Sequence, residues 1–194
     1  MTANSVLKIT LDTQCINDLL ERRADASWLD ACLRLAREGL VEIGIPAICG
    51  SENLPGYVRP ETLSLFLERL EKTGLSRSNL LFPIAYPDVT FWDCSIWSDD
   101  NLIALERKIH DILFPEDPAE YDASGKAGST PEKMYGKWIN RKCDVLVAWS
   151  HIHYGRDVLL TRDRNFRKKS ILPHLLALGA GRIVTPQDFV SSLS

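Results

Sequence analysis

The stretch CDVLVAWSHIHYGRDVLLTRDRNF, residues Cys143–Phe166, places an apolar helix, a turn and a strand in immediate succession. The helical part begins near Asp144 and ends at Gly155, and the strand-like run DVLLT follows at Asp157–Thr161. Strands that alternate with helices in this way are typical of a mostly parallel α/β sheet. In such a sheet, ligands bind beyond the carboxyl ends of the strands. Asp163, which follows this strand, is therefore a candidate site residue.

The same alternation extends to both sides of this stretch. Val6–Leu11, VLKITL, predicts a buried strand because it is β-branched and aliphatic, and the strand ends at Asp12 and Thr13. Hydrophobic spacing predicts helices at 15–23, 25–38, 61–72, 98–114, 132–155 and 166–178, strands at 40–47 and 182–184, and a last helix that opens at Thr185. The aromatic and proline-rich segment 82–97 is not assigned to a regular element.

Length and composition are those of one globular domain spanning residues 1–194. The polar segment 115–130, rich in glycine, proline and small residues, is expected to be a flexible loop within that domain. The net charge of −3 excludes a strongly basic protein, so any contact with nucleic acid must depend on a local patch.

The five cysteines form no C-x-x-C pair and lie among apolar neighbours, which predicts buried, reduced thiols rather than a metal site. No window approaches the about 18 apolar residues of a membrane span, and the N-terminal residues do not resemble a secretory signal. We therefore expect a cytoplasmic protein without a membrane partner.

Three aspartates form the candidate chemical centre. Asp12 and Asp163 follow two predicted strands, and Asp144 opens the helix that leads into the second of these strands. Carboxylates brought to one edge of a sheet repel one another, and a divalent cation relieves this repulsion. Ligation by oxygen alone suits a hard ion, so the pattern predicts that these aspartates bind Mg²⁺ or Mn²⁺.

The stretch Cys143–Phe166 resembles the signature of PIN domains, in particular the toxin-type ribonucleases of bacteria. The signature has an acidic residue that opens an apolar helix, then an aliphatic strand, then Thr-x-Asp-x-(Asp or Asn)-Phe. The tail Ile183–Val190 and the opening Ile9–Leu20 are similar to the family's last and first elements, so the resemblance covers both ends of the chain, about 70 residues. It implies a three-layer α/β/α PIN-like fold with a mostly parallel central sheet. The middle of the chain, roughly 53–137, is longer than in a minimal toxin of this kind.

By this resemblance, Asp12, Asp144 and Asp163 are metal ligands, and Thr13 and Asn165 lie close to the substrate. The family also has an acidic residue after its second strand. Glu52 stands at about the expected place and is taken as the fourth catalytic acid, and the alternatives are Glu42 and Glu61.

The implied activity is hydrolysis of phosphodiester bonds in RNA by metal-activated water. Basic residues that flank the aspartates are candidate contacts for the substrate backbone, above all Arg162, Arg164 and Lys142. The resemblance further implies a possible homodimer and a possible antitoxin protein as partner, in a toxin–antitoxin pair.

One alternative belongs to a different class of protein, a PIN-like scaffold with a degraded site that binds RNA or protein without cleavage. The irregular region around Glu52 and the amide at Asn165 allow this interpretation. A phosphatase of the haloacid dehalogenase type would need an acidic residue where this chain has Gln14. Trp92, Trp97 and Trp138 could stack on bases, although core packing is the expected role of each.

Overall fold

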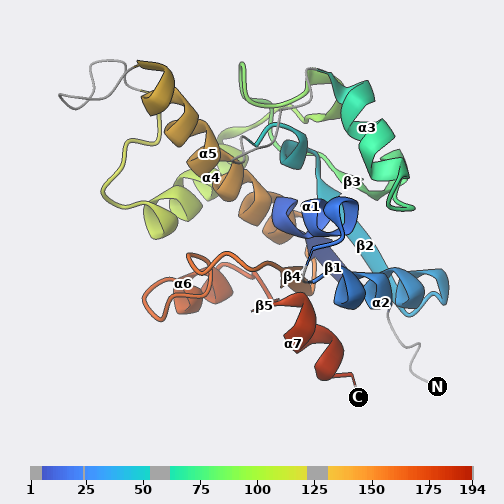
Figure 1. Cartoon of the computed structure of the whole chain (residues 1–194). Helices are drawn as coiled ribbons and strands as arrows, with labels where there is room; N and C mark the ends of the chain where they lie inside the picture. Colours follow the sequence, from blue (N-terminus) through green and yellow to red (C-terminus); the bar gives the residue numbers. More distant parts are fainter. Residues whose placement is uncertain (1–5, 24, 53–61, 122–130, 194) are drawn as a thin grey trace.

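A computed structural model describes residues 6–23, 25–52, 62–121 and 131–193 of the chain (Figure 1). Its centre is a five-stranded sheet in which all paired strands are parallel, in the order β3-β2-β1-β4-β5. The strands are β1 (Leu7–Leu11), β2 (Val41–Pro46), β3 (Leu80–Leu81), β4 (Val158–Leu160) and β5 (Arg182–Val184). The order along the sheet reverses between β1 and β4, which is where ligand sites of parallel sheets form.

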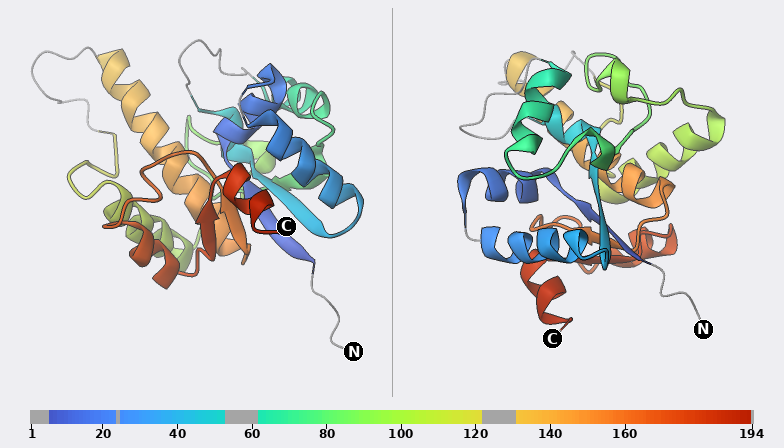
Figure 2. Two further views of the ribbon diagram at one scale, coloured as in Figure 1. Left: turned by 60° about the horizontal axis from the view of Figure 1, so that its bottom comes forward. Right: turned by 90° about the vertical axis from the view of Figure 1, so that its right-hand side faces the viewer.

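Helices cover both faces of this sheet, so the fold is a three-layer α/β/α arrangement (Figures 1 and 2). One layer includes α1 (Thr13–Glu21), α2 (Ala26–Arg37) and α7 (Pro186–Ser191), in which α2 contacts both α1 and α7. The other layer includes α4 (Asp100–Leu113), α5 (Pro131–His153) and α6 (Leu172–Ala177), in which α4 contacts both α5 and α6. The helix α3 (Leu63–Glu71) lies beside α1 and precedes β3.

The core lies where these layers meet the sheet. β4 buries all three of its residues and β1 buries its last three, because both faces of a parallel sheet are covered by helices. The longest helix, α5, packs against β2 and α4 through a fully buried face that includes Leu146 and Trp149. All five cysteines are buried and unpaired, as the sequence predicted.

Most of the predicted elements are confirmed, and two differ. The unassigned segment 82–97 lies beside the short β3 and forms a bridge from Ile84 to Ile96 and a 3₁₀ turn, η3 (Trp92–Cys94). The helix predicted at 166–178 is shorter, because residues 164–171 form turns and α6 begins only at Leu172, with Pro173 in its first turn.

The predicted loop at 115–130 divides into two parts. Residues 115–121 pack against α5, where Trp138 Nε1 donates a hydrogen bond to the Ala119 carbonyl and Arg141 pairs with Asp117. Residues 122–130 lie outside the described residues. Within the described ranges, no helix is both long enough and apolar enough to cross a membrane.

Candidate active site

Thr161 links Asp12 and Asp163 by hydrogen bonds at the point where the strand order reverses. Its hydroxyl donates a hydrogen bond of 2.6 Å to Asp12 Oδ2 and accepts one of 2.9 Å from the Asp163 backbone N–H. The backbone hydrogen bonds between β1 and β4 also continue to this point, since the Asp12 N–H donates to the Leu160 carbonyl at 3.2 Å. Asp12 and Asp163 therefore lie at adjacent strand ends, as expected from the sequence.

Asp12 also begins α1. Its Oδ1 accepts a hydrogen bond of 2.7 Å from the Thr13 backbone N–H, and its side chain is only 4% exposed. Burial raises the pKa of Asp12 from its ordinary value of 3.8 to about 6, and the charge of Asp163 adds to the rise. The hydrogen bonds from Thr161 and Thr13 oppose it. Hydrogen bonds thus hold the Asp12 carboxylate in place, while its burial disfavours the charged form.

Glu52 belongs to the same cluster. It follows β2 and the 3₁₀ turn η1 (Ala47–Gly50), and it is 8% exposed. Burial, and then the charges of Asp12 and Asp163, raise its pKa from 4.5 to about 7. The Thr13 hydroxyl is close enough to oppose this rise, although it makes no hydrogen bond of good geometry.

Asp144 comes to the cluster from α5, the helix that packs on η1. Asp144 is half-buried. Desolvation of its carboxylate raises its pKa well above the ordinary value, and the charges of Glu52, Asp12 and Asp163 each add to the rise. Four carboxylates from four separate segments thus act on one another electrostatically, and the sequence had singled out all four.

Glu42 and Glu61 were the alternatives to Glu52 as the fourth acid, and neither is found with the aspartates among the described residues. Glu42 is the second residue of β2, near the opposite end of the strand, and it pairs with Arg156, whose guanidinium also bonds the Ile9 and Glu42 carbonyls. Glu61 lies outside the described residues. Of the two glutamates that the structure describes, Glu52 is the one placed with the aspartates.

The chemistry of these residues fits a hard divalent cation, because the donors are carboxylate oxygens whose mutual repulsion a cation would relieve. Within residues 6–23, 25–52, 62–121 and 131–193, no group of three or more His, Cys, Asp or Glu residues is arranged as it would be around a bound metal ion. Carboxylates that repel one another are expected to stand apart unless a cation draws them together.

Buried polar atoms without a hydrogen-bond partner gather around this cluster. In the described part of the chain there are eight such side-chain atoms, and four of them lie on α1 or directly after η1. These four are Thr13 Oγ1, Asn17 Nδ2, Asp18 Oδ2 and Ser51 Oγ. Because folded proteins satisfy nearly all buried polar groups, their concentration here indicates a functional site.

The residues expected to contact the substrate differ in exposure and in the contacts they already make. Thr13 is buried at the start of α1, and Asn165 is partly exposed, with its backbone N–H bonded to Asp163 Oδ1 at 2.7 Å. Arg164 is exposed beside them. Arg162 is engaged elsewhere: it donates to Asp18 Oδ1 at 2.8 Å and lies 3.3 Å from Asp25 Oδ2.

Lys142 does not fit the role predicted for it. Its side chain is 1% exposed, and its ammonium donates a hydrogen bond of 2.7 Å to Glu106 Oε1, itself buried on α4. The ammonium also lies 4.3 Å from the centre of the Tyr86 ring. A lysine held in this way links α4 to α5 and cannot reach a substrate backbone, so the expectation for Lys142 is corrected.

Sequence reasoning gave Thr161 no role, although it is the residue that joins Asp12 to Asp163. The signal was present, because a threonine that ends a strand two positions before an aspartate can accept that residue's backbone N–H. The bond to Asp12 was not visible in the sequence, since it depends on β1 and β4 being neighbours.

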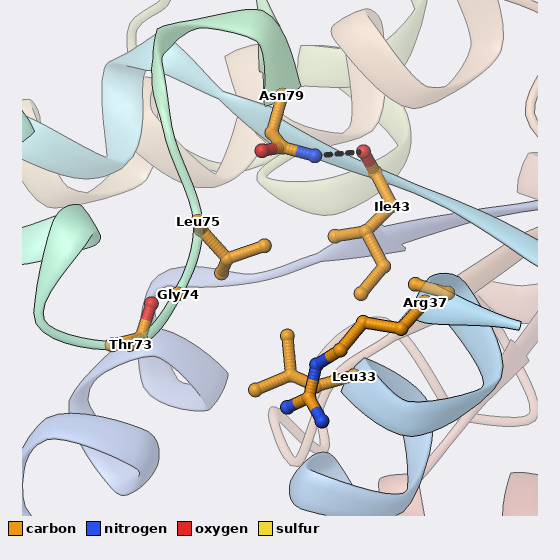
Figure 3. Close-up of a pocket in the computed structure, with 8 residues that line it drawn as sticks. Leu33, Arg37, Ile43, Thr73, Gly74, Leu75 and Asn79 are labelled. Carbon is orange, nitrogen blue, oxygen red and sulfur yellow. Dashed lines mark hydrogen bonds between the residues drawn. The ribbon is translucent and has the colours of Figure 1, made fainter.

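Two shallow hollows lie away from the carboxylates. One, of about 180 Å³, is bounded by α2, β2 and the turn before β3, where Arg37 and Asn79 border the apolar Leu33 and Leu75 (Figure 3). The other, of about 270 Å³, is lined mainly by tyrosines and Trp138. Neither is lined by any of the four acids.

The three tryptophans considered for base stacking also differ in their exposure. Trp138 is 9% exposed and packs among tyrosines, as expected of a core residue. Trp92 and Trp97 are 60% and 84% exposed, and their ring centres are 6.0 Å apart, so the expectation of core packing is wrong for these two.

Comparison of the chain with protein-family models, with curated proteins and with solved structures gives no match. An all-parallel three-layer α/β/α fold thus carries four interacting carboxylates at the reversal of its strand order.

Proposed function

We propose that the protein is a metal-dependent endoribonuclease of the PIN type. One observation carries the proposal: Asp12, Glu52 and Asp144 each have a pKa that burial raises and that the charge of Asp163 raises further. Such an arrangement costs stability, and groups with strongly perturbed pKa values concentrate at functional sites. The position of the cluster, beyond the carboxyl ends of β1 and β4, supports the same conclusion.

Asp12, Asp144 and Asp163 would hold Mg²⁺ or Mn²⁺, with Glu52 as the fourth acid. The bound ion would supply a water molecule of lowered pKa and would neutralise charge on the phosphate. Thr161 keeps Asp12 and Asp163 in place through its two hydrogen bonds. Glu52, with a pKa of about 7, is suited to accept or release a proton near neutral pH.

The proposed substrate is RNA, single-stranded or structured. Arg164 and Asn165, exposed and partly exposed beside Asp163, are the residues expected to contact its backbone. The proposal extends to a cytoplasmic location, which the five reduced cysteines support, and to a homodimer or an antitoxin protein as partner.

The test combines metal binding with cleavage. We expect Mn²⁺ to raise the melting temperature of the wild-type protein and to support cleavage of a labelled RNA. Asp12→Asn should abolish both effects. Asp93→Asn, which removes an exposed carboxylate on η3, is the matched control and should behave as wild type. A wild-type protein that neither gains stability from Mn²⁺ nor cleaves any RNA would rule out the enzyme.

One observation favours a second function, a scaffold that binds RNA without cleaving it. The residue two positions after Asp163 is the amide Asn165, which adds no further negative charge to the four acids. This alternative predicts RNA binding that EDTA does not change and that survives Asp12→Asn. The enzyme predicts that cleavage stops in EDTA and returns when Mn²⁺ is added.

A further inference from the structure

A hollow lined by aromatic side chains lies apart from the carboxylate cluster. Its volume is about 270 Å³, and it is formed where the turn at residues 86–89 and the segment that ends at residue 121 meet α5. None of its lining residues belongs to the four acids or to the residues proposed to contact RNA. Four of them are aromatic: Tyr86, Tyr121, Tyr135 and Trp138.

The aromatic rings border the hollow at different angles. Tyr121 and Tyr135 are nearly perpendicular, with ring centres 5.1 Å apart and an angle of 81° between their planes. Both contact the Trp138 ring, at 5.8 Å and 5.9 Å between centres, and Tyr86 contacts the same ring at 5.9 Å. A hydrogen bond of 3.2 Å from Nε1 to the Ala119 carbonyl holds the indole of Trp138 in place. The rings are therefore a fixed set of walls, and the face of each carries partial negative charge.

Two carboxylates add full negative charge to this lining. Asp88 and Glu120 are both exposed, and none of the described residues that line the hollow is basic. The Tyr86 hydroxyl donates a hydrogen bond to Glu120, which holds the carboxylate beside the rings. Arg107 lies 3.4 Å from Glu120 and is not part of the lining, and an ion pair between two exposed side chains is weak. Aromatic faces with net negative charge beside them attract a cation.

A lysine of the protein already makes such contacts with two of these rings. The Lys142 ammonium lies 4.3 Å from the centre of the Tyr86 ring and 5.8 Å from that of Trp138. Lys142 is 1% exposed, is paired with the buried Glu106, and does not line the hollow. The rings thus stabilise one cation inside the fold. Because Glu106 neutralises that cation, a second cation in the hollow meets little repulsion from it.

We propose that this hollow binds a small organic cation with an alkylated ammonium group. Such a group has no N–H donors that require acceptors, and its methyl groups pack on aromatic faces. Pockets for drug-sized ligands measure about 300–1,000 Å³, so a hollow of about 270 Å³ suits a smaller molecule. The hollow of Figure 3, by contrast, has no aromatic lining residue and is bordered by Arg37. The proposed site is separate from the ribonuclease activity and does not depend on it.

The test compares a cation with a neutral molecule of the same shape. The probes are choline and dimethylbutanol, its analogue with carbon in place of nitrogen, each added to the full chain. Binding is followed by the NMR signals of the ligand methyl groups, which nearby aromatic rings shift upfield. We expect choline to bind with a Kd of about 1 mM and dimethylbutanol to bind at least about tenfold more weakly. Equal affinities, or no shift of the choline signal, would overturn the proposal.

The variants separate the aromatic faces from the charges. Tyr135→Leu keeps apolar surface but removes a ring, and it should weaken choline binding about tenfold, whereas Tyr135→Phe keeps the ring and should bind as wild type. The double variant Asp88→Asn, Glu120→Gln should also weaken binding at low salt, and its new amide can still accept from the Tyr86 hydroxyl. Trp97→Leu removes an exposed ring outside the lining and should bind as wild type.

The outcomes decide this site separately from the proposed function. Equal affinity of Tyr135→Leu and Tyr135→Phe for choline would refute the use of the ring face. Loss of binding in Trp97→Leu would place the cation elsewhere and refute the site. Choline binding with these variant effects, by a wild-type protein that cleaves no RNA, would support the site and refute the enzyme.

Discussion

Thr161 and Asp12, separated by 149 positions in the chain, are joined by a hydrogen bond of 2.6 Å between the hydroxyl and Oδ2. The bond is buried and charge-assisted, so it couples the position of the acid to the pairing of β1 with β4.

Replacing Thr161 with valine keeps the shape of the side chain and removes both of its hydrogen bonds. Because hydrogen bonds to charged groups contribute about 1.5–3 kcal/mol, we expect the free energy of unfolding at pH 7 to fall by about that amount. Urea denaturation measures the change. Thr161→Ser, which keeps the hydroxyl, should lose less than half as much, and equal losses in the two variants would contradict this role.

The buried acids give stability a definite pH dependence. The pKa of Asp12 is about 6 in the folded protein and 3.8 ordinarily, so between these values the folded state binds more protons than the unfolded state. Asp12 therefore lowers stability as pH rises from about 4 to about 6, by up to about 1.4 kcal/mol per pH unit. In EDTA, Asp12→Asn should gain stability relative to wild type over this range. Parallel curves for the two proteins would show that Asp12 keeps its ordinary pKa.

His151 changes the stability of the protein with pH in the opposite direction to Asp12. It is fully buried between Thr10 Oγ1 at 2.9 Å and the Ala180 carbonyl at 2.6 Å, and burial lowers its pKa from 6.5 to about 4. The unfolded state then binds more protons between these values, so His151 lowers stability as pH falls from about 6.5 to about 4. His151→Gln, compared with wild type over this interval, should remove that loss even if its stability at pH 7 is lower.

The buried pair of Lys142 and Glu106 predicts a structural rather than a substrate-binding phenotype. Lys142→Met leaves Glu106 without its partner and should lower the free energy of unfolding by about 3–5 kcal/mol. The double variant Lys142→Met, Glu106→Leu should recover most of that loss, because no unpaired charge remains. RNA affinity of the folded double variant should equal that of wild type. A double variant that folds well but binds RNA weakly would restore the role first predicted for Lys142.

The sequence predicted the fold, and with it the positions of Asp12 and Asp163, for one physical reason. A buried parallel strand is an unbroken aliphatic run, so VLKITL and DVLLT were recognisable, and the residues just after them had to meet at one edge of the sheet. β3 was not recognisable, because two residues, Leu80 and Leu81, carry no periodicity.

The cations could not be assigned in the same way. A run of basic residues shows where charge is available, and the acids that neutralise it come from distant elements. Asp18 on α1 pairs with Arg162, and Glu106 on α4 pairs with Lys142.

The strand order also has a consequence for the folding of the protein during its synthesis. β1 is made first, but its pairing with β4 must wait until about four fifths of the chain has been translated. Such distant pairing slows folding, because a long loop must close before the contact forms. On a ribosome that has not yet reached Thr161, Asp12 has neither its hydrogen bond nor its neighbour Asp163. The carboxylate cluster is therefore one of the last features to assemble in a newly made chain.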